Sequence, residues 1–175
     1  MSESKNTGVL IGLAALAGWL FFTSESSDSG AADQTTAPDP DTYIKNNWAL
    51  AKTYQSWTGI PPVFTLAQAG LESAWGTSNI ARHSKNQFGI TADSGWTGDT
   101  YKGYRAYASI YDSYQDHALY LQNNSRYAPA FNTTDPTQFA AAIAKAGYAT
   151  DPNYKDELNN VISYVQRVVD NNNLT

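Results

Sequence analysis

Residues 61–76 read PPVFTLAQAGLESAWG, and this stretch carries the clearest periodicity in the chain. Its apolar residues recur three and four positions apart: Val63, Leu66, Ala67, Gly70, Leu71, Ala74 and Trp75. That spacing predicts a helix with one buried face. The paired prolines Pro61 and Pro62 favour a helix start, and Gly76 follows where a left-handed cap would end the helix. We therefore expect a buried helix here, with the rest of the chain organised around it.

Glu72 is the only carboxylate in this stretch, on the border of the apolar face. Gln68 precedes it by one turn, and Trp75 follows about one turn later. An acid held against an indole is partly desolvated, which disfavours the charged form and raises the pKa. A carboxyl that keeps its proton can act as a general acid, as the catalytic glutamate of lysozyme does. From position alone, a solvated or ion-paired Glu on the helix rim is the alternative.

Further motifs follow in order along the chain, and together they resemble the glucosaminidase domain of glycoside hydrolase family 73. The matching segments are residues 67–78 (AQAGLESAWGTS), 80–81 (IA), 86–90 (NQFGI), 104–107 (YRAY), 113–117 (SYQDH) and 146–154 (AGYATDPNY). The likeness spans roughly residues 42–170. One departure is Lys85-Asn86-Gln87-Phe88, where the family usually has two asparagines and an apolar residue before the Phe.

The resemblance implies a lysozyme-like fold and an endo-β-N-acetylglucosaminidase that cleaves β-1,4 bonds of the cell-wall glycan. Glu72 would be its proton donor. The resemblance also implies that Tyr148 is a cleft residue, which would orient a substrate 2-acetamido group or steady the developing cation. A tyrosine that only packs at the start of a loop is the alternative for Tyr148.

A second group must activate or hold the nucleophile. Inverting enzymes place a second carboxylate about 6.5–9.5 Å from the acid, and retaining enzymes about 5–5.5 Å. Asp99, between Gly98 and Thr100 in an expected hairpin, is our first choice for this carboxylate, and Asp93 is the second. Each could be an ordinary turn residue, because Asp is favoured in turns without any catalysis. Attack by the substrate's own acetamido group is a third design, and it needs no second carboxylate.

Aromatic and polar residues near Glu72 are candidates for sugar binding: Trp75, Asn86, Phe88, Asp93 and Tyr114. Phe88 could instead close the core. His117 is expected to be a buried structural histidine bonded to a neighbour, and His83 to be exposed. Two separated histidines without cysteine argue against a zinc site. No phosphate loop, dinucleotide fingerprint or Gly-x-Ser-x-Gly motif indicates a cofactor or a serine hydrolase.

Composition fits one modest domain with an appendage. The chain of 175 residues is 42% hydrophobic, with a formal charge of −5 and no cysteine. Residues 41–175 hold 10 Lys and Arg against 11 Asp and Glu, so this part is nearly neutral. No basic face indicates nucleic acid as a partner. Twelve Tyr and five Trp suit a ligand with apolar sugar faces and hydroxyls.

The N-terminal part is expected to be an appendage in two pieces. Residues 1–23 contain an uncharged apolar run over 9–22, which as a helix would cover about 21 Å of an about 30 Å bilayer core. We interpret it as a retained membrane anchor with the domain outside, and a cleaved signal peptide is the main alternative. Residues 24–40 predict a disordered acidic linker, and residues 41–175 the catalytic domain.

Periodicity and caps predict helices over residues 41–58, 62–75, 77–82, 109–124, 136–146 and 153–170, with a small β-lobe over 91–107. The expected fold class is α+β, mostly α, with a lysozyme-like arrangement. The leading function is a membrane-tethered peptidoglycan hydrolase. A lytic transglycosylase or muramidase is one alternative, and a non-catalytic glycan-binding module is another. The setting is a bacterial cell envelope or a lipid-containing phage virion, and the oligomeric state stays open.

Overall fold

The computed structural model describes residues 39–175, which form a mostly helical domain with one small antiparallel hairpin. The elements in order are α1 (Pro40–Thr58), α2 (Pro62–Ser73), α3 (Asn79–Ser84), β1 (Thr100–Tyr101), β2 (Tyr104–Arg105), α4 (Ile110–Asn123), the 3₁₀ helix η1 (Ser125–Asn132), α5 (Pro136–Lys145) and α6 (Tyr154–Asn171). This order confirms the expected mostly helical class with a small β-lobe.

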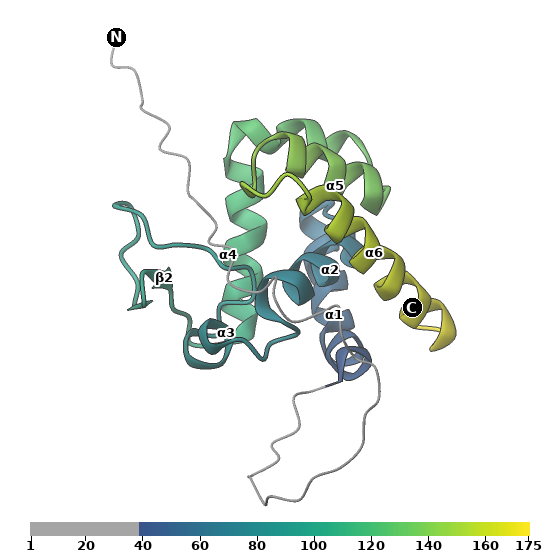
Figure 1. The fold of residues 1–175 in the computed structure, drawn as a ribbon, viewed down its shortest axis with the longest axis horizontal. Coiled ribbons are helices and arrows are strands. Elements are labelled where there is room, and N and C mark those ends of the chain that lie inside the picture. The colour runs from purple at the N-terminus through teal and green to yellow at the C-terminus, as the bar shows by residue number, and fades with distance from the viewer. Residues whose placement is uncertain (1–38) are drawn as a thin grey trace, which may run out of the picture.

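Helix α2 lies in the middle of the domain and packs against α1, α5 and α6 (Figure 1). Ten of its twelve residues are buried, so it is apolar nearly all round rather than on one face. A helix of that kind is stable only when neighbours cover it on several sides. Phe64 of α2 and Phe139 of α5 pack at a ring-centroid distance of 4.6 Å within this core. The predicted central role of this stretch is confirmed.

Caps made by nearby residues set several helix ends. Ser109 and Asp112 form a reciprocal capping box at the start of α4. The Asp135 side chain accepts from the Thr137 and Gln138 amides at the start of α5. Gly59, with φ of 78°, ends α1 in the left-handed conformation. Local sequence therefore fixes these boundaries within one or two residues.

The end of α2 differs from the prediction. The helix stops at Ser73, and Ala74, Trp75 and Gly76 follow with φ of 50°, 56° and 80°. Left-handed conformation is expected for Gly76 but uncommon for Ala74 and Trp75. Ser73 supports the turn, because its hydroxyl donates to the Ala69 carbonyl and accepts from the Gly76 amide at 2.7 Å. Ala74 and Trp75 therefore do not continue the helical face, as their spacing suggested.

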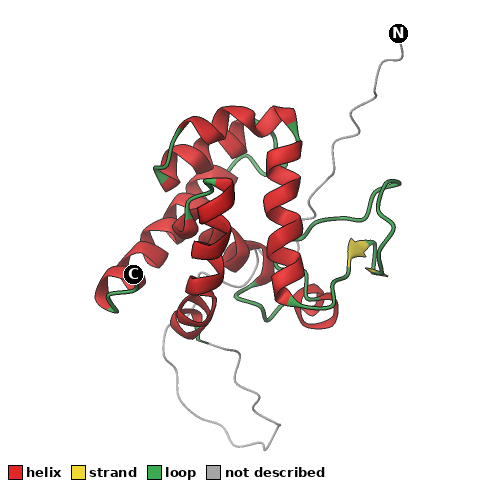
Figure 2. Cartoon of the chain, turned by 180° about the vertical axis from the view of Figure 1, so that it is seen from behind, coloured by secondary structure: helices red, strands yellow, loops and turns green. Residues whose placement is uncertain are grey.

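The β-lobe projects from one side of the helical body, away from α5 and α6 (Figure 2). It consists of the two-residue strands β1 and β2, with Thr100 opposite Arg105, and one further bridge between Thr91 and Tyr104. Gly103 turns the hairpin with φ of 82°. Most of residues 93–103 are exposed, so this lobe has little core of its own.

The sequence predicts no helix for η1, and the structure does not describe residues 1–38. The 3₁₀ helix η1 contains Pro129 and carried no periodic signal in the sequence. The expected membrane anchor (1–23) lies outside the described residues, as does the linker (24–40) apart from its last two positions. Within residues 39–175, no helix has the length and apolar character needed to cross a bilayer.

Candidate active site

Glu72 lies in the last turn of α2, with its side chain half-buried. Gln68 precedes it by four residues, so the two side chains share one face of the helix. That face meets Tyr154 of α6 and His117 of α4, whereas the face around Gly70, about 200° away, meets Trp75. The acid is thus placed at the end of the most buried helix, where the helix turns into the left-handed segment.

A chain of buried polar side chains runs from this face into the domain. The Tyr154 hydroxyl lies close enough to the Glu72 carboxyl for the two groups to shift each other's pKa. Gln68 Nε2 donates to the same hydroxyl at 2.8 Å, and Gln68 Oε1 contacts Nε2 of His117 at 2.7 Å. Three elements, α2, α4 and α6, therefore join in one relay, His117–Gln68–Tyr154–Glu72.

Burial changes the acidity of both ends of this relay. Desolvation raises the pKa of Glu72 to about 8, against the opposing effect of the Tyr154 hydrogen bond. Desolvation lowers the pKa of His117 to about 3, so this imidazole is neutral at physiological pH. A carboxyl that keeps its proton near neutral pH is the state that a general acid requires.

The aromatic surroundings of Glu72 differ from the expected ones. The Trp75 indole packs on Gly70, where a Cβ would lie 2.4 Å from the ring, and contacts Tyr43 and Tyr164 at centroid distances of 5.9 Å. Tyr154 supplies the hydroxyl beside the acid instead. The predicted desolvation is present, but the indole named as its source lies on the opposite face of α2.

Tyr148 lies beside the acid, in the loop between α5 and α6. Its ring stacks on Tyr154 at a centroid distance of 5.9 Å. Burial, followed by the charges of Tyr154 and Glu72, raises the pKa of Tyr148 well above the ordinary value. Tyr148 is 1% exposed, and its hydroxyl donates to the Phe88 carbonyl at 3.4 Å. The structure brings Tyr148 to the site as a wall residue, and its direct role in catalysis stays a prediction.

Four predicted sugar-binding residues are buried: Trp75, Asn86, Phe88 and Tyr114, between 0% and 4% exposed. Asn86 uses its whole amide internally, because Nδ2 donates to the Ile90 and Arg105 carbonyls and Oδ1 accepts from the Phe88 and Ile90 amides. These four side chains are enclosed by the protein in this structure, and their role in sugar binding stays a prediction.

The buried rings serve the relay and the core instead. Phe88 stacks on His117 with centroids 3.7 Å apart and planes 4° from parallel. The Tyr114 hydroxyl lies 3.3 Å from that of Tyr43, which donates to Gln87 Oε1 at 2.8 Å. Gln87, which stands where the family pattern has an apolar residue, is thus a buried structural contact. His117 is confirmed as a buried histidine bonded to a neighbour, and His83 as exposed.

The two candidate second carboxylates lie in the β-lobe with different partners. Asp93 pairs with Arg105 at 3.4 Å and accepts from the Gly95 amide. Asp99 is exposed, and its backbone carbonyl accepts from Trp96 Nε1 and the Ala106 amide. Neither is among the causes of the raised Glu72 pKa. The structure does not join either aspartate to the acid, so their role stays a prediction.

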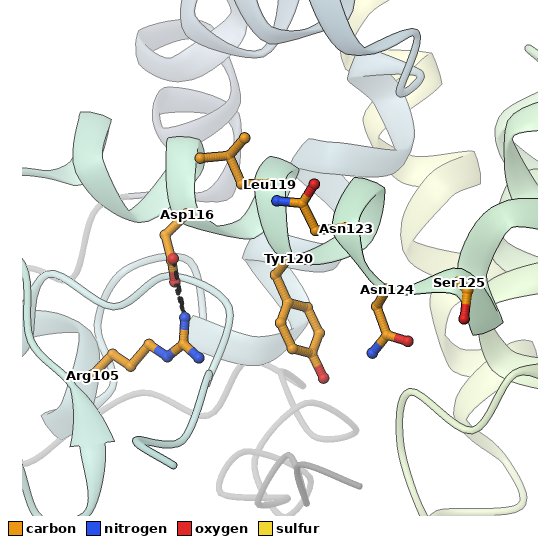
Figure 3. Close-up of a pocket in the computed structure, with 7 residues that line it drawn as sticks. All are labelled: Arg105, Asp116, Leu119, Tyr120, Asn123, Asn124 and Ser125. Atoms are coloured by element: carbon orange, nitrogen blue, oxygen red, sulfur yellow. Dashed lines mark hydrogen bonds and ion pairs between the residues drawn. The ribbon is translucent and has the colours of Figure 1, made fainter. Parts of the chain in front are cut away.

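Two cavities border the tyrosines near Glu72, which are Tyr148, Tyr154 and the neighbouring Tyr120. One, of about 670 Å³, is lined by Arg105, Asp116, Leu119, Tyr120, Asn123, Asn124 and Ser125. Figure 3 shows Asp116, Tyr120 and Asn124 projecting toward the same side of α4 as the Arg105–Asp116 ion pair. The Tyr120 ring lies 6.5 Å from that of Tyr148. The second cavity, of about 370 Å³, includes Tyr154 and the loop from Ala149 to Pro152.

Tyr154 is the site residue that the sequence did not single out. Its position in residues 146–154 was noted only as part of a motif, and nothing in the local pattern distinguishes it from Tyr148. The position of Gln68 one turn before Glu72 is the only local sequence feature that indicates the relay. The contact with His117 joins positions 49 residues apart and carries no local signature.

A helical body, a small antiparallel lobe and a glutamate at the end of the central helix are typical of the class of lysozyme-like glycoside hydrolases. The sequence profile of the glucosaminidase family, described as mannosyl-glycoprotein endo-beta-N-acetylglucosaminidase, matches residues 48–167. The chain belongs to this family.

Similar proteins agree with that assignment. The peptidoglycan hydrolase FlgJ of Vibrio parahaemolyticus is 31% identical over 156 residues, which cover 77% of this chain and 51% of the relative. The chain thus spans about half the length of the curated relatives it matches. The glycoside hydrolase domain of Salmonella typhimurium FlgJ superposes with a TM-score of 0.67 at 32% identity, covering 76% of this chain and 92% of that one. A peptidoglycan hydrolase from Sphingomonas sp. A1 gives 0.66 at 36%, covering 74% and 92%.

Proposed function

We propose that this chain is a peptidoglycan hydrolase that cleaves the β-1,4 glycosidic bond following N-acetylglucosamine, with Glu72 as general acid. The observation that carries the proposal is the half-buried Glu72 carboxyl, whose pKa is raised to about 8 while Tyr154 bonds to it. Membership of the glucosaminidase family and the names of the FlgJ relatives support the glycan substrate.

Cleavage requires protonation of a poor leaving oxygen while positive charge develops at C1 of the sugar. Glu72 is protonated below about pH 8 and can deliver its proton directly to the bridging oxygen. Loss of the proton leaves a carboxylate, which the Tyr154 hydroxyl then stabilises by donating to it. Glu72 and Tyr154 therefore act together both before and after the proton is transferred.

For the second group, we propose Asp99 as the general base of an inverting reaction. A carboxylate about 5–5.5 Å away, as retaining enzymes have, would raise the pKa of Glu72 by like-charge repulsion. The Glu72 pKa reflects desolvation and Tyr154, with no carboxylate contributing. An inverting separation or attack by the substrate acetamido group fits better. Asp93 is already paired with Arg105, whereas the exposed Asp99 side chain is open to solvent.

We propose that the two cavities receive the glycan or its peptide on either side of the cleaved bond. One includes Tyr154 itself, and the other is lined by Tyr120, whose ring contacts that of Tyr148. Both therefore adjoin the neighbours of Glu72. Hydroxyl, amide and guanidinium groups line the larger cavity, and these match the hydroxyls and amides of an N-acetylated sugar chain.

Residues 1–23 are proposed to anchor the chain in a membrane, with residues 24–40 as a tether and the domain outside. The support is the uncharged run over residues 9–22 and the acidic composition that follows it. A cell envelope and a lipid-containing virion are both compatible settings. Flotation with liposomes tests the anchor: the full chain should float, and a chain lacking residues 1–23 should remain at the bottom.

The activity is tested by digesting purified sacculi and reducing the products with borohydride before mass spectrometry. Reduced N-acetylglucosamine ends are expected. Reduced muramic ends would instead indicate a muramidase, and anhydromuramic ends a lytic transglycosylase.

The role of Glu72 is tested by comparing wild type with Glu72→Gln on the same substrate. A general acid contributes about 10²–10⁴-fold, and we expect a loss in this range. Glu157→Gln is the matched control, because Glu157 is the only other glutamate between residues 39 and 175. Equal digestion by wild type and Glu72→Gln would remove Glu72 as the acid. No digestion by wild type would favour a glycan-binding module without turnover.

A further inference from the structure

The relay behind Glu72 has a direction, set by which atoms donate. Gln68 Nε2 donates to the Tyr154 hydroxyl, so Gln68 Oε1 faces Nε2 of His117. An amide oxygen only accepts, so His117 must carry its hydrogen on Nε2 to satisfy this contact. The Tyr154 oxygen already accepts from Gln68, which leaves its single hydrogen free to be donated to the nearby Glu72 carboxyl.

The opposite direction is also chemically possible. If the Gln68 amide were rotated by 180°, Oε1 would accept from Tyr154 and Nε2 would donate to an unprotonated Nε2 of His117. Tyr154 would then donate its hydrogen to Gln68 and could only accept a hydrogen bond from Glu72. A protonated Glu72 would donate to the Tyr154 oxygen, and its proton would be turned away from the sugar bridge.

We propose that His117 is a positioning residue for the reaction: by donating to Gln68, it fixes the direction of the relay, so that Tyr154 donates to Glu72 and the Glu72 proton stays available to substrate. Three observations support this proposal. Gln68 is fully buried, so no water competes for its amide. His117 is 1% exposed and held flat against Phe88. Both contacts of Gln68 are short, at 2.7 and 2.8 Å.

Among the described residues, no other group that faces the relay changes charge near neutral pH. Tyr154 from α6 and Tyr148 from the α5–α6 loop face Glu72, and burial holds both of their pKa values well above the ordinary value. His117 from α4 faces Gln68, Phe88 and Tyr148, and its low pKa keeps it neutral. The titration of Glu72 itself is therefore a clean readout of the relay direction.

The inference rests on the proposed function for its catalytic meaning, but its test does not need turnover. In the full-length chain, the ¹³Cδ shift of Glu72 is followed against pH in wild type, His117→Phe and His117→Gln. Phe keeps the flat stack on Phe88 but cannot donate, whereas the Gln amide can replace Nε2 as donor. His83→Phe is the matched control, because His83 is exposed on α3.

His117→Phe should raise the Glu72 midpoint by about one pH unit, since loss of one hydrogen bond to the carboxylate is worth about that much. His117→Gln and His83→Phe should stay near wild type. Addition of His117→Phe to Tyr154→Phe should give no further shift, because the hydrogen that His117 directs is then gone. In sacculus digestion, His117→Phe should lower kcat about tenfold and move the alkaline limb of the pH profile upward.

An unchanged Glu72 midpoint in folded His117→Phe would overturn the inference. The ¹⁵N shifts of His117 in wild type provide a second test that needs no variant: the neutral Nε2–H tautomer supports the inference, and an Nδ1–H or protonated ring overturns it. These outcomes are separate from the proposed function. If Glu72→Gln still digests sacculi, the proposed function fails while the coupling between His117 and Glu72 can stand.

Discussion

The end of α2 and the β-lobe hold the candidate catalytic groups in opposite ways. Glu72 lies on a helix that three others cover, and its neighbours Gln68 and Tyr154 are buried. Asp99 lies on a two-stranded hairpin whose residues are mostly exposed. The acid is therefore tuned by the core, whereas the lobe can place a second group only through a few hydrogen bonds.

This difference suits the two regions to different roles in catalysis. A raised carboxyl pKa needs burial, which the packed helices around α2 supply. A base that activates water needs access to solvent, which the hairpin has. Segments with few buried contacts also open at low free-energy cost, so the lobe is the part suited to move as a glycan enters.

The largest effect expected from the lobe is on catalysis. Asp99→Asn should lower kcat by about 10²-fold if Asp99 is the general base, whereas Asp93→Asn should stay within a few fold. For wild type and both variants, ¹H NMR is used to determine the anomeric form of the first product. The α-anomer supports inversion with Asp99. A β-anomer with full activity in Asp99→Asn would contradict it and favour the acetamido group.

Substitution of one glycine in each region compares their rigidity. Gly70→Ala places a Cβ 2.4 Å from the Trp75 ring inside the core, and overpacking of this kind costs about 1–3 kcal/mol. Gly103→Ala meets nothing within 4 Å but must adopt φ of 82°, which costs about 1 kcal/mol. Chemical denaturation measures both. If Gly103→Ala lowered the free energy of unfolding more than Gly70→Ala does, the lobe would be more rigid than the core around Gly70.

The pKa of Glu72 also predicts a pH-dependent stability. Between its unfolded value near 4.5 and its folded value near 8, the folded state binds more protons than the unfolded state, so stability falls as pH rises through this window. Glu72→Gln lacks this loss. We expect the variant to gain about 2 kcal/mol over wild type between pH 4 and pH 9, at about 1.4 kcal/mol per pKa unit with allowance for partial exposure. A pH-independent difference in urea unfolding would contradict the raised pKa.

The smallest effect concerns the hydroxyl beside the acid. Tyr154→Phe removes a hydrogen bond that lowers the Glu72 pKa, so the pKa should rise and the alkaline limb of kcat/KM should move up by about one pH unit. Tyr107→Phe is the control, because that hydroxyl bonds to Asp116 instead. Equal shifts in both variants would show that the change does not arise beside Glu72.

The sequence predicted most of the helical frame because its signals are local. The caps Ser109 and Asp135 and the left-handed Gly59 set boundaries through contacts within a few residues. Glu72 could be singled out for the same reason, from its position in one helix. The family motifs added the assignment, and the glucosaminidase profile confirms it.

The surroundings of the acid could not be predicted from local pattern. Trp75 continues the apolar spacing of α2, but the left-handed turn after Ser73 folds its ring back onto Gly70. Asn86, Phe88 and Tyr114 are aromatic or polar residues near a motif, and only tertiary packing decides that they face inward. Tyr154 reaches Glu72 from 82 residues away, through the packing of α6 on α2.

The most direct measurement is the titration of the Glu72 side chain by ¹³C NMR in the wild-type full-length chain. The account predicts a midpoint near pH 8, with Glu72→Gln used to assign the signal. A midpoint near 4.5 would mean that the carboxyl is ionised at neutral pH, and it would contradict the role of Glu72 as the proton donor.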